Sequence, residues 1–151
     1  MARSVRALRR VPLAPEAALA LWADVERWPS FVEGFARVID RSPDWPAEGA
    51  RVVWESTPEG RGKVTEKVLE RGTASFATQV YDDSIHGRQV LRVLEDGEGS
   101  RVELGLDYEL SKPGVVGAVT DMLFIRRALR DSLERTLRRF AVEAEEEAGL
   151  R

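Results

Sequence analysis

The 151-residue chain contains no cysteine and only one histidine, His86. The absence of cysteine excludes disulfide bonds, thiolate nucleophiles and thiolate metal ligands. A single histidine excludes any metal site built from several imidazoles, and no loop gathers the Asp and Glu residues that a hard cation such as calcium needs. We therefore expect neither a metal nor another cofactor.

The chain also lacks a long hydrophobic run, because nothing approaches the roughly 18 consecutive apolar residues of a membrane span. The arginine-rich N-terminus precedes an Ala/Leu-rich stretch and superficially resembles a signal peptide. Pro12, Pro15 and Glu16 interrupt that stretch, so we interpret it as a strand followed by a helix. We expect a cytoplasmic protein without stable membrane insertion.

Basic residues are not in excess, since 23 Lys and Arg stand against 26 Asp and Glu, for a formal net charge of -3. Nucleic-acid-binding domains usually carry an excess of positive charge, so we expect no nucleic-acid partner. With 43% hydrophobic residues the chain is too apolar to be disordered, and its length fits one domain.

The pattern of turn signals predicts a strand, two short helices and then a run of strands. Residues 3–11 alternate loosely as an edge strand does, and two helices follow at 15–25 and 29–34. Between residues 35 and 111, Gly-, Pro- and Asp-rich turns predict an antiparallel meander. Its strands are expected at 35–41, 51–57, 62–70, 74–82, 86–95 and 101–110.

The last strand and the C-terminal segment give the clearest periodicities. Val102, Leu104, Leu106, Tyr108 and Leu110 alternate with polar residues or glycine, which predicts one buried and one solvated face. Residues 115–147 then predict one long helix with a continuous apolar stripe. The stripe comprises Val115, Val119, Met122, Leu129, Leu133, Leu137, Phe140 and Ala144.

This order of elements resembles the START/Bet v 1-like (SRPBCC) superfamily, in particular its polyketide cyclase/dehydrase and lipid-transport group. Residues 21–34, LWADVERWPSFVEG, are similar to the family's helix pair, in which an Asp, an aromatic residue before Pro, then Phe and Gly recur. The segments 54–68 and 102–110 are similar to its strands. The resemblance covers nearly the whole chain and is specific for the fold, but the superfamily has no universal catalytic motif.

The resemblance implies an α+β helix-grip fold, in which a curved antiparallel sheet of about seven strands wraps around the long helix. We expect one such domain over residues 1–147 and a frayed C-terminus at 148–151. It also implies a deep cavity between sheet and helix, in which relatives hold lipids, sterols, quinones or aromatic polyketides.

Three polar residues are candidates for contact with a ligand. Tyr108 is expected to point inward, either as a core aromatic with its hydroxyl at the rim or as a hydrogen-bond donor to the ligand. Arg126 lies beside the apolar stripe. It is either a cationic anchor for the polar end of a ligand or, as we favour, a side chain that extends to the flank of the helix. Glu66 faces the cavity if Val64 and Val68 do, where burial would suit a general base, although a solvated Glu66 is the favoured interpretation.

Apolar candidates for the cavity lining come from the strands and from both helical regions. They are Phe31, which could double as a gate, Trp54, Phe76, Leu106, Met122 and Leu129. Leu123 and Phe124 extend the apolar surface to the outer side of the long helix. Either a loop covers them, which is the commoner solution, or they contact a partner or a membrane.

We favour a binder or carrier of a hydrophobic small molecule, a lipid, quinone or polyketide-like compound, because no catalytic constellation is present. The first alternative is a polyketide cyclase or dehydratase that uses Tyr108, Arg126 or Glu66. The second is a protein-interaction module with a filled cavity that acts through Leu123 and Phe124, and a homodimer is possible.

Overall fold

The computed structural model describes residues 3–111 and 118–150, the first five of the second range by their backbone only. Three helical elements follow the first strand, six strands come next and a long helix ends the chain. The elements are β1 (Arg3–Val11), α1 (Pro15–Ala23), the 3₁₀ turn η1 (Val25–Arg27), α2 (Trp28–Phe31), β2 (Phe35–Arg41), β3 (Arg51–Ser56), β4 (Lys63–Arg71), β5 (Ser75–Tyr81), β6 (Ile85–Asp96), β7 (Gly99–Leu110) and α3 (Ala118–Glu147).

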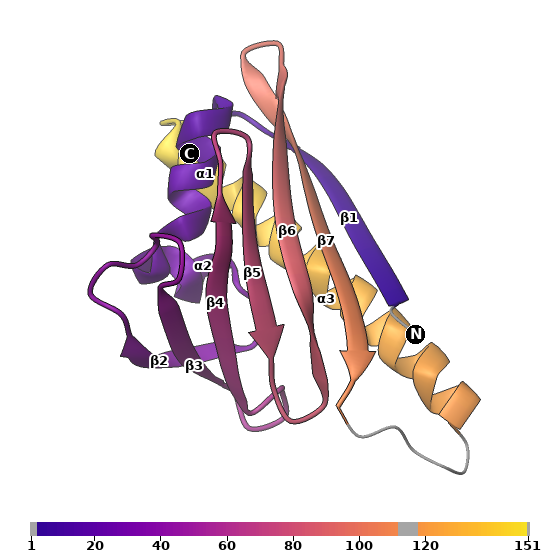
Figure 1. Cartoon of the computed structure of the whole chain (residues 1–151). Coiled ribbons are helices and arrows are strands. Elements are labelled where there is room, and N and C mark those ends of the chain that lie inside the picture. The colour runs from indigo at the N-terminus through magenta and orange to yellow at the C-terminus, as the bar shows by residue number, and fades with distance from the viewer. Residues whose placement is uncertain (1–2, 112–117, 151) are drawn as a thin grey trace.

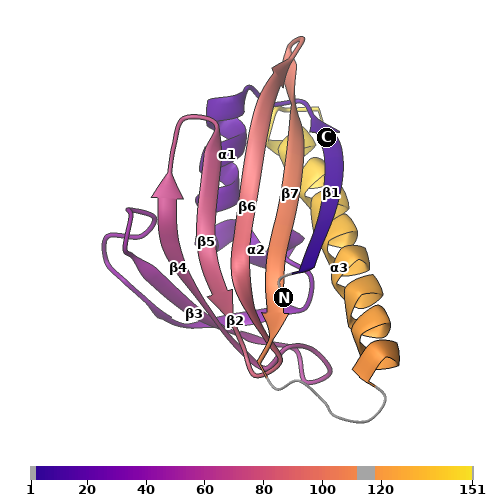
Figure 2. The ribbon, with the colours of Figure 1, turned by 45° about the vertical axis from the view of Figure 1, so that its right-hand side comes forward.

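The strands form one antiparallel sheet in the order β1-β7-β6-β5-β4-β3-β2. Strands β2 to β7 are a meander, and β1 is placed beside β7, with Val5 opposite Leu106. The sheet curves around α3, which crosses its inner face diagonally (Figures 1 and 2). The predicted α+β helix-grip fold is thereby confirmed.

The two short helices are shorter than predicted. The first ends at Ala23, because the Asp24 side chain accepts a hydrogen bond from the backbone N–H of Glu26 at 3.1 Å and caps η1 instead. The second ends at Phe31 after a single turn. The predicted beginning of the long helix at residue 115 lies outside the described residues.

Helix α3 buries the C-terminal half of its predicted stripe, including Leu133, Leu137 and Phe140. Its end is closed by Gly149, which has a φ of 76° and accompanies a hydrogen bond from the Leu150 N–H to the Glu145 carbonyl at 2.8 Å. Fraying of the last residues stays a prediction.

Aromatic side chains fill the interior beside the C-terminal half of α3. The ring centroids of Trp22, Phe31 and Phe140 lie 5.1–5.5 Å apart, and the Trp54 ring packs against Phe35 in a tilted arrangement with a centroid distance of 5.4 Å. All of these except Phe35 are buried. This part of the space between sheet and helix is therefore occupied by the protein itself.

Candidate ligand-binding site

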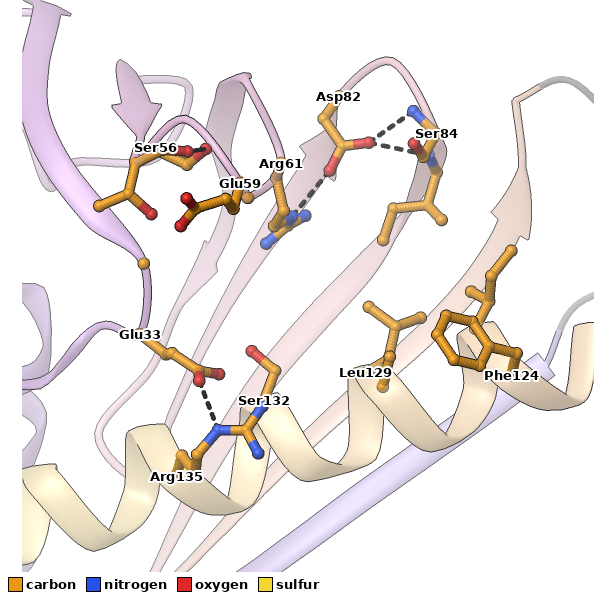
Figure 3. A pocket seen from close by; sticks show the side chains of 16 residues that line it. Glu33, Ser56, Glu59, Arg61, Asp82, Ser84, Phe124, Leu129, Ser132 and Arg135 are labelled. Carbon is orange, nitrogen blue, oxygen red and sulfur yellow. Dashed lines mark hydrogen bonds and ion pairs between the residues drawn. The ribbon is translucent and has the colours of Figure 1, made fainter. Parts of the chain in front are cut away.

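A groove of about 550 Å³ lies between the N-terminal half of α3 and the turns at one end of the sheet. The β3–β4 turn, the β5–β6 turn and the α2–β2 connection form its upper wall, and α3 forms its floor (Figure 3). Its apolar surface comes from Ile85, Phe124, Ile125, Ala128 and Leu129. Ligand pockets usually measure roughly 300–1,000 Å³, so this groove has room for a small molecule.

Arg61 and Asp82 form the polar upper wall of the groove. The Arg61 Nε donates to the Asp82 carboxylate at 2.7 Å, and the same carboxylate accepts the backbone N–H groups of Ser84 at 2.7 Å and Ile85 at 2.9 Å. The guanidinium carbon also lies 5.9 Å from the centre of the Trp54 ring, within the range of a cation–π contact. These contacts hold the Arg61 side chain in one position.

A second ion pair, between Glu33 and Arg135, lies at the other side of the groove (Figure 3). The backbone N–H of Glu33 donates to the Thr136 hydroxyl at 3.1 Å, which fixes the α2–β2 connection to α3. The charged groups of the groove wall are Glu33, Glu59, Arg61, Asp82 and Arg135. Three carboxylates against two guanidinium groups give the groove a formal charge of -1.

An inner cavity of about 40 Å³ continues inward from the groove, since Glu33, Arg61 and Ser132 line both spaces. It reaches Glu66 and Gln89 on the sheet. A cavity of this size holds about one to three water-sized groups. In place of the deep cavity that the family resemblance implies, this part of the interior holds a small space lined by both apolar and polar side chains.

Glu66 is the only buried carboxyl group of the described sheet, with 6% of its surface exposed. Trp54 Nε1 donates to one of its oxygens at 2.9 Å and the Thr78 hydroxyl to the other at 3.2 Å. The three residues come from the adjacent strands β3, β4 and β5. Alternation of side chains places all three on the inner face, so the sheet itself positions this group.

Burial raises the pKa of the Glu66 carboxyl above its ordinary value of 4.5, because a desolvated carboxylate is costly. The hydrogen bond from Trp54, the positive charge of Arg61 and the hydrogen bond from Thr78 oppose this rise without cancelling it. Burial therefore favours the protonated, uncharged form of Glu66, which can donate a hydrogen bond or a proton.

The structure brings together some of the residues that the sequence proposed. Glu66 and Trp54 meet at the inner cavity, while Leu129 and Phe124 line the groove. The favoured interpretation of a solvated Glu66 is wrong, because Val64, Glu66 and Val68 form the inward set of β4.

Other proposed residues lie elsewhere in the fold. Phe31 belongs to the buried aromatic cluster, and Leu106 is part of the core. Phe76 borders a separate depression of about 400 Å³ between α1 and the β4–β5 turn, at the opposite end of the sheet. Tyr108 is buried, and its hydroxyl has no hydrogen-bond partner among the described residues, so it does not reach the rim. Whether any of these four residues contacts a ligand stays a prediction.

On α3, Arg126 is exposed, and the side chain of Met122 lies outside the described residues. Leu123 and Phe124 are exposed by 66% and 73%. The expectation that a loop covers them is therefore wrong for the part of the chain that the structure describes, which leaves both side chains exposed. Phe124 instead forms the lip of the groove.

Arg61 and Asp82 are not among the site residues predicted from the sequence. The usable signal was the topology: in an antiparallel meander the β3–β4 and β5–β6 turns lie at the same end of the sheet. A charged residue of opposite sign in each turn can then form an ion pair across 21 positions of sequence.

Among the described side chains, those of residues 3–111 and 123–150, no three from His, Asp and Glu gather as a metal site requires. In the same part of the chain, no helix combines the length and apolar character needed to cross a membrane.

Comparison with solved structures finds the same fold in several proteins. A protein from Thermus thermophilus is 22% identical with a TM-score of 0.74, covering 96% of this chain and 99% of its own. The Zhui aromatase/cyclase of a Streptomyces species is 14% identical with a TM-score of 0.78, covering 98% and 96%. The di-domain aromatase/cyclase StfQ of the steffimycin biosynthetic pathway is 16% identical with a TM-score of 0.79, and 99% of this chain matches 52% of it.

Comparison with curated proteins gives no match. The sequence profile of the family described as "Polyketide cyclase / dehydrase and lipid transport" matches residues 2–145. This match and the structural neighbours confirm the resemblance to the START/Bet v 1-like superfamily. At the level of the family they support hydrophobic-ligand binding or cyclase activity. The chain belongs to the polyketide cyclase/dehydrase and lipid transport family.

Proposed function

We propose that this protein binds a hydrophobic small molecule, a lipid, quinone or polyketide-like compound, in the groove between α3 and the sheet-end turns. The observation that carries the proposal is the groove itself, with its volume of about 550 Å³ and its apolar floor. Leu129 and Ile125 on the floor are only partly buried, and Phe124 is exposed by 73%. A ligand that covers these side chains removes apolar surface from water, which favours binding.

Polar groups along one wall suit a molecule with a polar end rather than a pure hydrocarbon. Arg61, Asp82, Ser56 and Ser84 lie opposite the apolar floor, so a ligand in the groove has one apolar and one polar side (Figure 3). In a pocket with an apolar lining, a few fixed polar groups set the orientation of the ligand and provide specificity.

A panel of apolar compounds tests the proposal through the melting temperature. We expect at least one quinone, lipid or polycyclic aromatic ketone to stabilise the protein by about 2.7 kcal/mol at a hundredfold excess over its dissociation constant. Ala128→Trp should abolish the effect, because Ala128 is exposed on the groove floor and an indole there fills the space.

Val142→Trp is the matched control for that variant. Val142 is 37% exposed on α3 and is not among the residues that line the groove, so the added indole should leave binding intact. The absence of stabilisation by any compound, or equal stabilisation of the Ala128→Trp variant, would count against a ligand in this groove.

Glu66 favours catalysis as a second candidate function, of the cyclase or dehydratase type. A carboxyl group whose pKa burial raises, beside a cavity that shares lining residues with the groove, is placed to donate a proton to a substrate oxygen. Of the three candidate acid/base residues, Glu66 adjoins the inner cavity, whereas Arg126 is exposed on α3. Under this function Glu66→Gln would lose turnover of a polyketide-like substrate while keeping its affinity.

A further inference from the structure

We infer that the inner cavity is the seat of an uncharged oxygen atom of the ligand, a carbonyl above all, and that Arg61 is its hydrogen-bond donor. The inference rests on the proposed function, because the rest of the ligand would occupy the groove. The inference adds to that proposal the chemical class of the ligand and the end of the molecule that lies in the inner cavity.

Arg61 is held at the boundary between the two spaces. It lines both the groove and the inner cavity, and only its Nε is used by Asp82, at 2.7 Å. Asp82 has just 1% of its side chain exposed and is fixed by two backbone N–H groups, so this ion pair is rigid. A donor held in place before binding loses little freedom when the ligand arrives.

The Nη2 atom of Arg61 is buried and lacks a hydrogen-bond partner within the described part of the chain. A buried N–H without an acceptor is unfavourable, and native proteins rarely leave one unexplained. Arg61 lines the inner cavity, so a ligand oxygen seated there is the acceptor that we infer for this N–H. The size of that cavity, about 40 Å³, suits a single polar atom or small group rather than a ring.

The other polar groups of the inner cavity suit the same oxygen. Beside apolar side chains such as Trp54, the polar residues that line it together with Arg61 are Glu33, Glu66, Gln89, Ser132 and Thr136. Gln89 and Ser132 carry hydrogen-bond donors, and burial raises the pKa of Glu66, which favours the form that can also donate. An oxygen with free lone pairs therefore meets several donors.

The charges around the cavity disfavour an anionic oxygen. Asp82 already neutralises Arg61, and Glu33 neutralises Arg135. With Glu59 the groove keeps a formal charge of -1, and a carboxylate in the cavity would in addition force Glu66 to stay protonated. Like charges at close range raise the cost of ionisation, so a ketone fits better than a carboxylic acid.

Three probes with one skeleton test this inference by titration calorimetry: 2-acetylnaphthalene, 2-ethylnaphthalene and 2-naphthoate. We expect the ketone to bind about tenfold more tightly than the hydrocarbon, as one hydrogen bond from a charged donor allows, and the carboxylate to bind most weakly. If the cavity does not hold the ketone oxygen, the hydrocarbon should bind more tightly than the ketone, because burying an unpaired carbonyl costs affinity.

Arg61→Met should reduce the ratio of ketone to hydrocarbon affinity to about one or below and leave the hydrocarbon affinity within about twofold. Arg135→Met is the matched control, since it removes the other groove arginine and should preserve the ratio. Because Arg61→Met leaves Asp82 unpaired, the double variant Arg61→Met/Asp82→Asn is measured beside it. The amide oxygen of the introduced asparagine can still accept the two backbone N–H groups that hold the turn.

The carbonyl stretching frequency of the bound ketone gives an independent readout on the unaltered protein. A hydrogen bond from Arg61 should lower this frequency below that of the ketone in an apolar solvent. A bound carbonyl without a hydrogen bond should keep the frequency found in the apolar solvent. If no probe binds the unaltered protein, the proposed function fails. If the probes bind but the hydrocarbon equals or exceeds the ketone, or the preference survives in both Arg61 variants, the oxygen seat alone fails.

Discussion

Replacing Trp54 with alanine is expected to lower the free energy of unfolding by about 3–5 kcal/mol, the range for truncating a large buried aromatic residue. Trp54 is 1% exposed and packs on Phe35 at 5.4 Å. Its removal also takes the Nε1 donor from Glu66 and the aromatic face from Arg61. Chemical denaturation of both proteins at one pH measures the difference.

The same substitution should enlarge the inner cavity, because Trp54 forms part of its wall. Indole, which replaces the missing side chain, is then expected to restore part of the lost stability in Trp54→Ala and to leave the unaltered protein unchanged. Trp54→Phe is the matched control, with a smaller loss of about 1–3 kcal/mol from the unpaired Glu66 oxygen. A loss below about 1 kcal/mol in the alanine variant would show that the Trp54 side chain does not fill the interior.

Glu66→Gln is expected to change how stability depends on pH. Since burial raises the pKa of Glu66 in the folded state, its contribution to stability is fully present below the ordinary pKa of 4.5 and is lost as pH rises through the folded value. The unaltered protein should lose stability relative to Glu66→Gln over this window, with a slope of at most about 1.4 kcal/mol per pH unit. Glutamine can keep both contacts, accepting from Trp54 and donating to the Thr78 hydroxyl.

Denaturation curves from pH 4 to 8 on both proteins give this difference directly. Glu70→Gln is the control on the same strand, because Glu70 is 58% exposed and its 3.4 Å ion pair with Arg88 lies at the surface. Exposed pairs contribute little, so this variant should parallel the unaltered protein. Parallel curves for Glu66→Gln as well would contradict a burial-raised pKa.

Periodicity was sufficient to predict the sheet and the long helix. The alternation from Val102 to Leu110 and the stripe from Leu129 to Ala144 each allow one buried face, and the family resemblance orders the remaining strands. The short helices were less well predicted, because the Asp24 cap replaces the last helical turn of α1 by a 3₁₀ turn.

The inward face of β4 could not be predicted from alternation. Val64 and Val68 favour one face of the strand as the inward one, whereas Thr65 and Leu69 favour the opposite face. The structure buries Thr65 as well as Glu66. The site itself depends on contacts between distant turns, such as Arg61 with Asp82, which follow from the topology of the sheet. The filling of the deep cavity depends on how the Trp54 and Phe31 rings pack, and this is not encoded in periodicity.

The most direct test of the central claim, a ligand in the groove, is a titration of the ¹⁵N-labelled protein with 2-acetylnaphthalene followed by amide NMR. We predict that shifts concentrate on groove residues such as Gly60, Ser84, Ala128 and Ser132. The amides of Leu19, Ala20 and Gly72, which border the separate depression of about 400 Å³, should stay in place. Saturable shifts at that depression with none in the groove, or no shifts at all, would contradict the account.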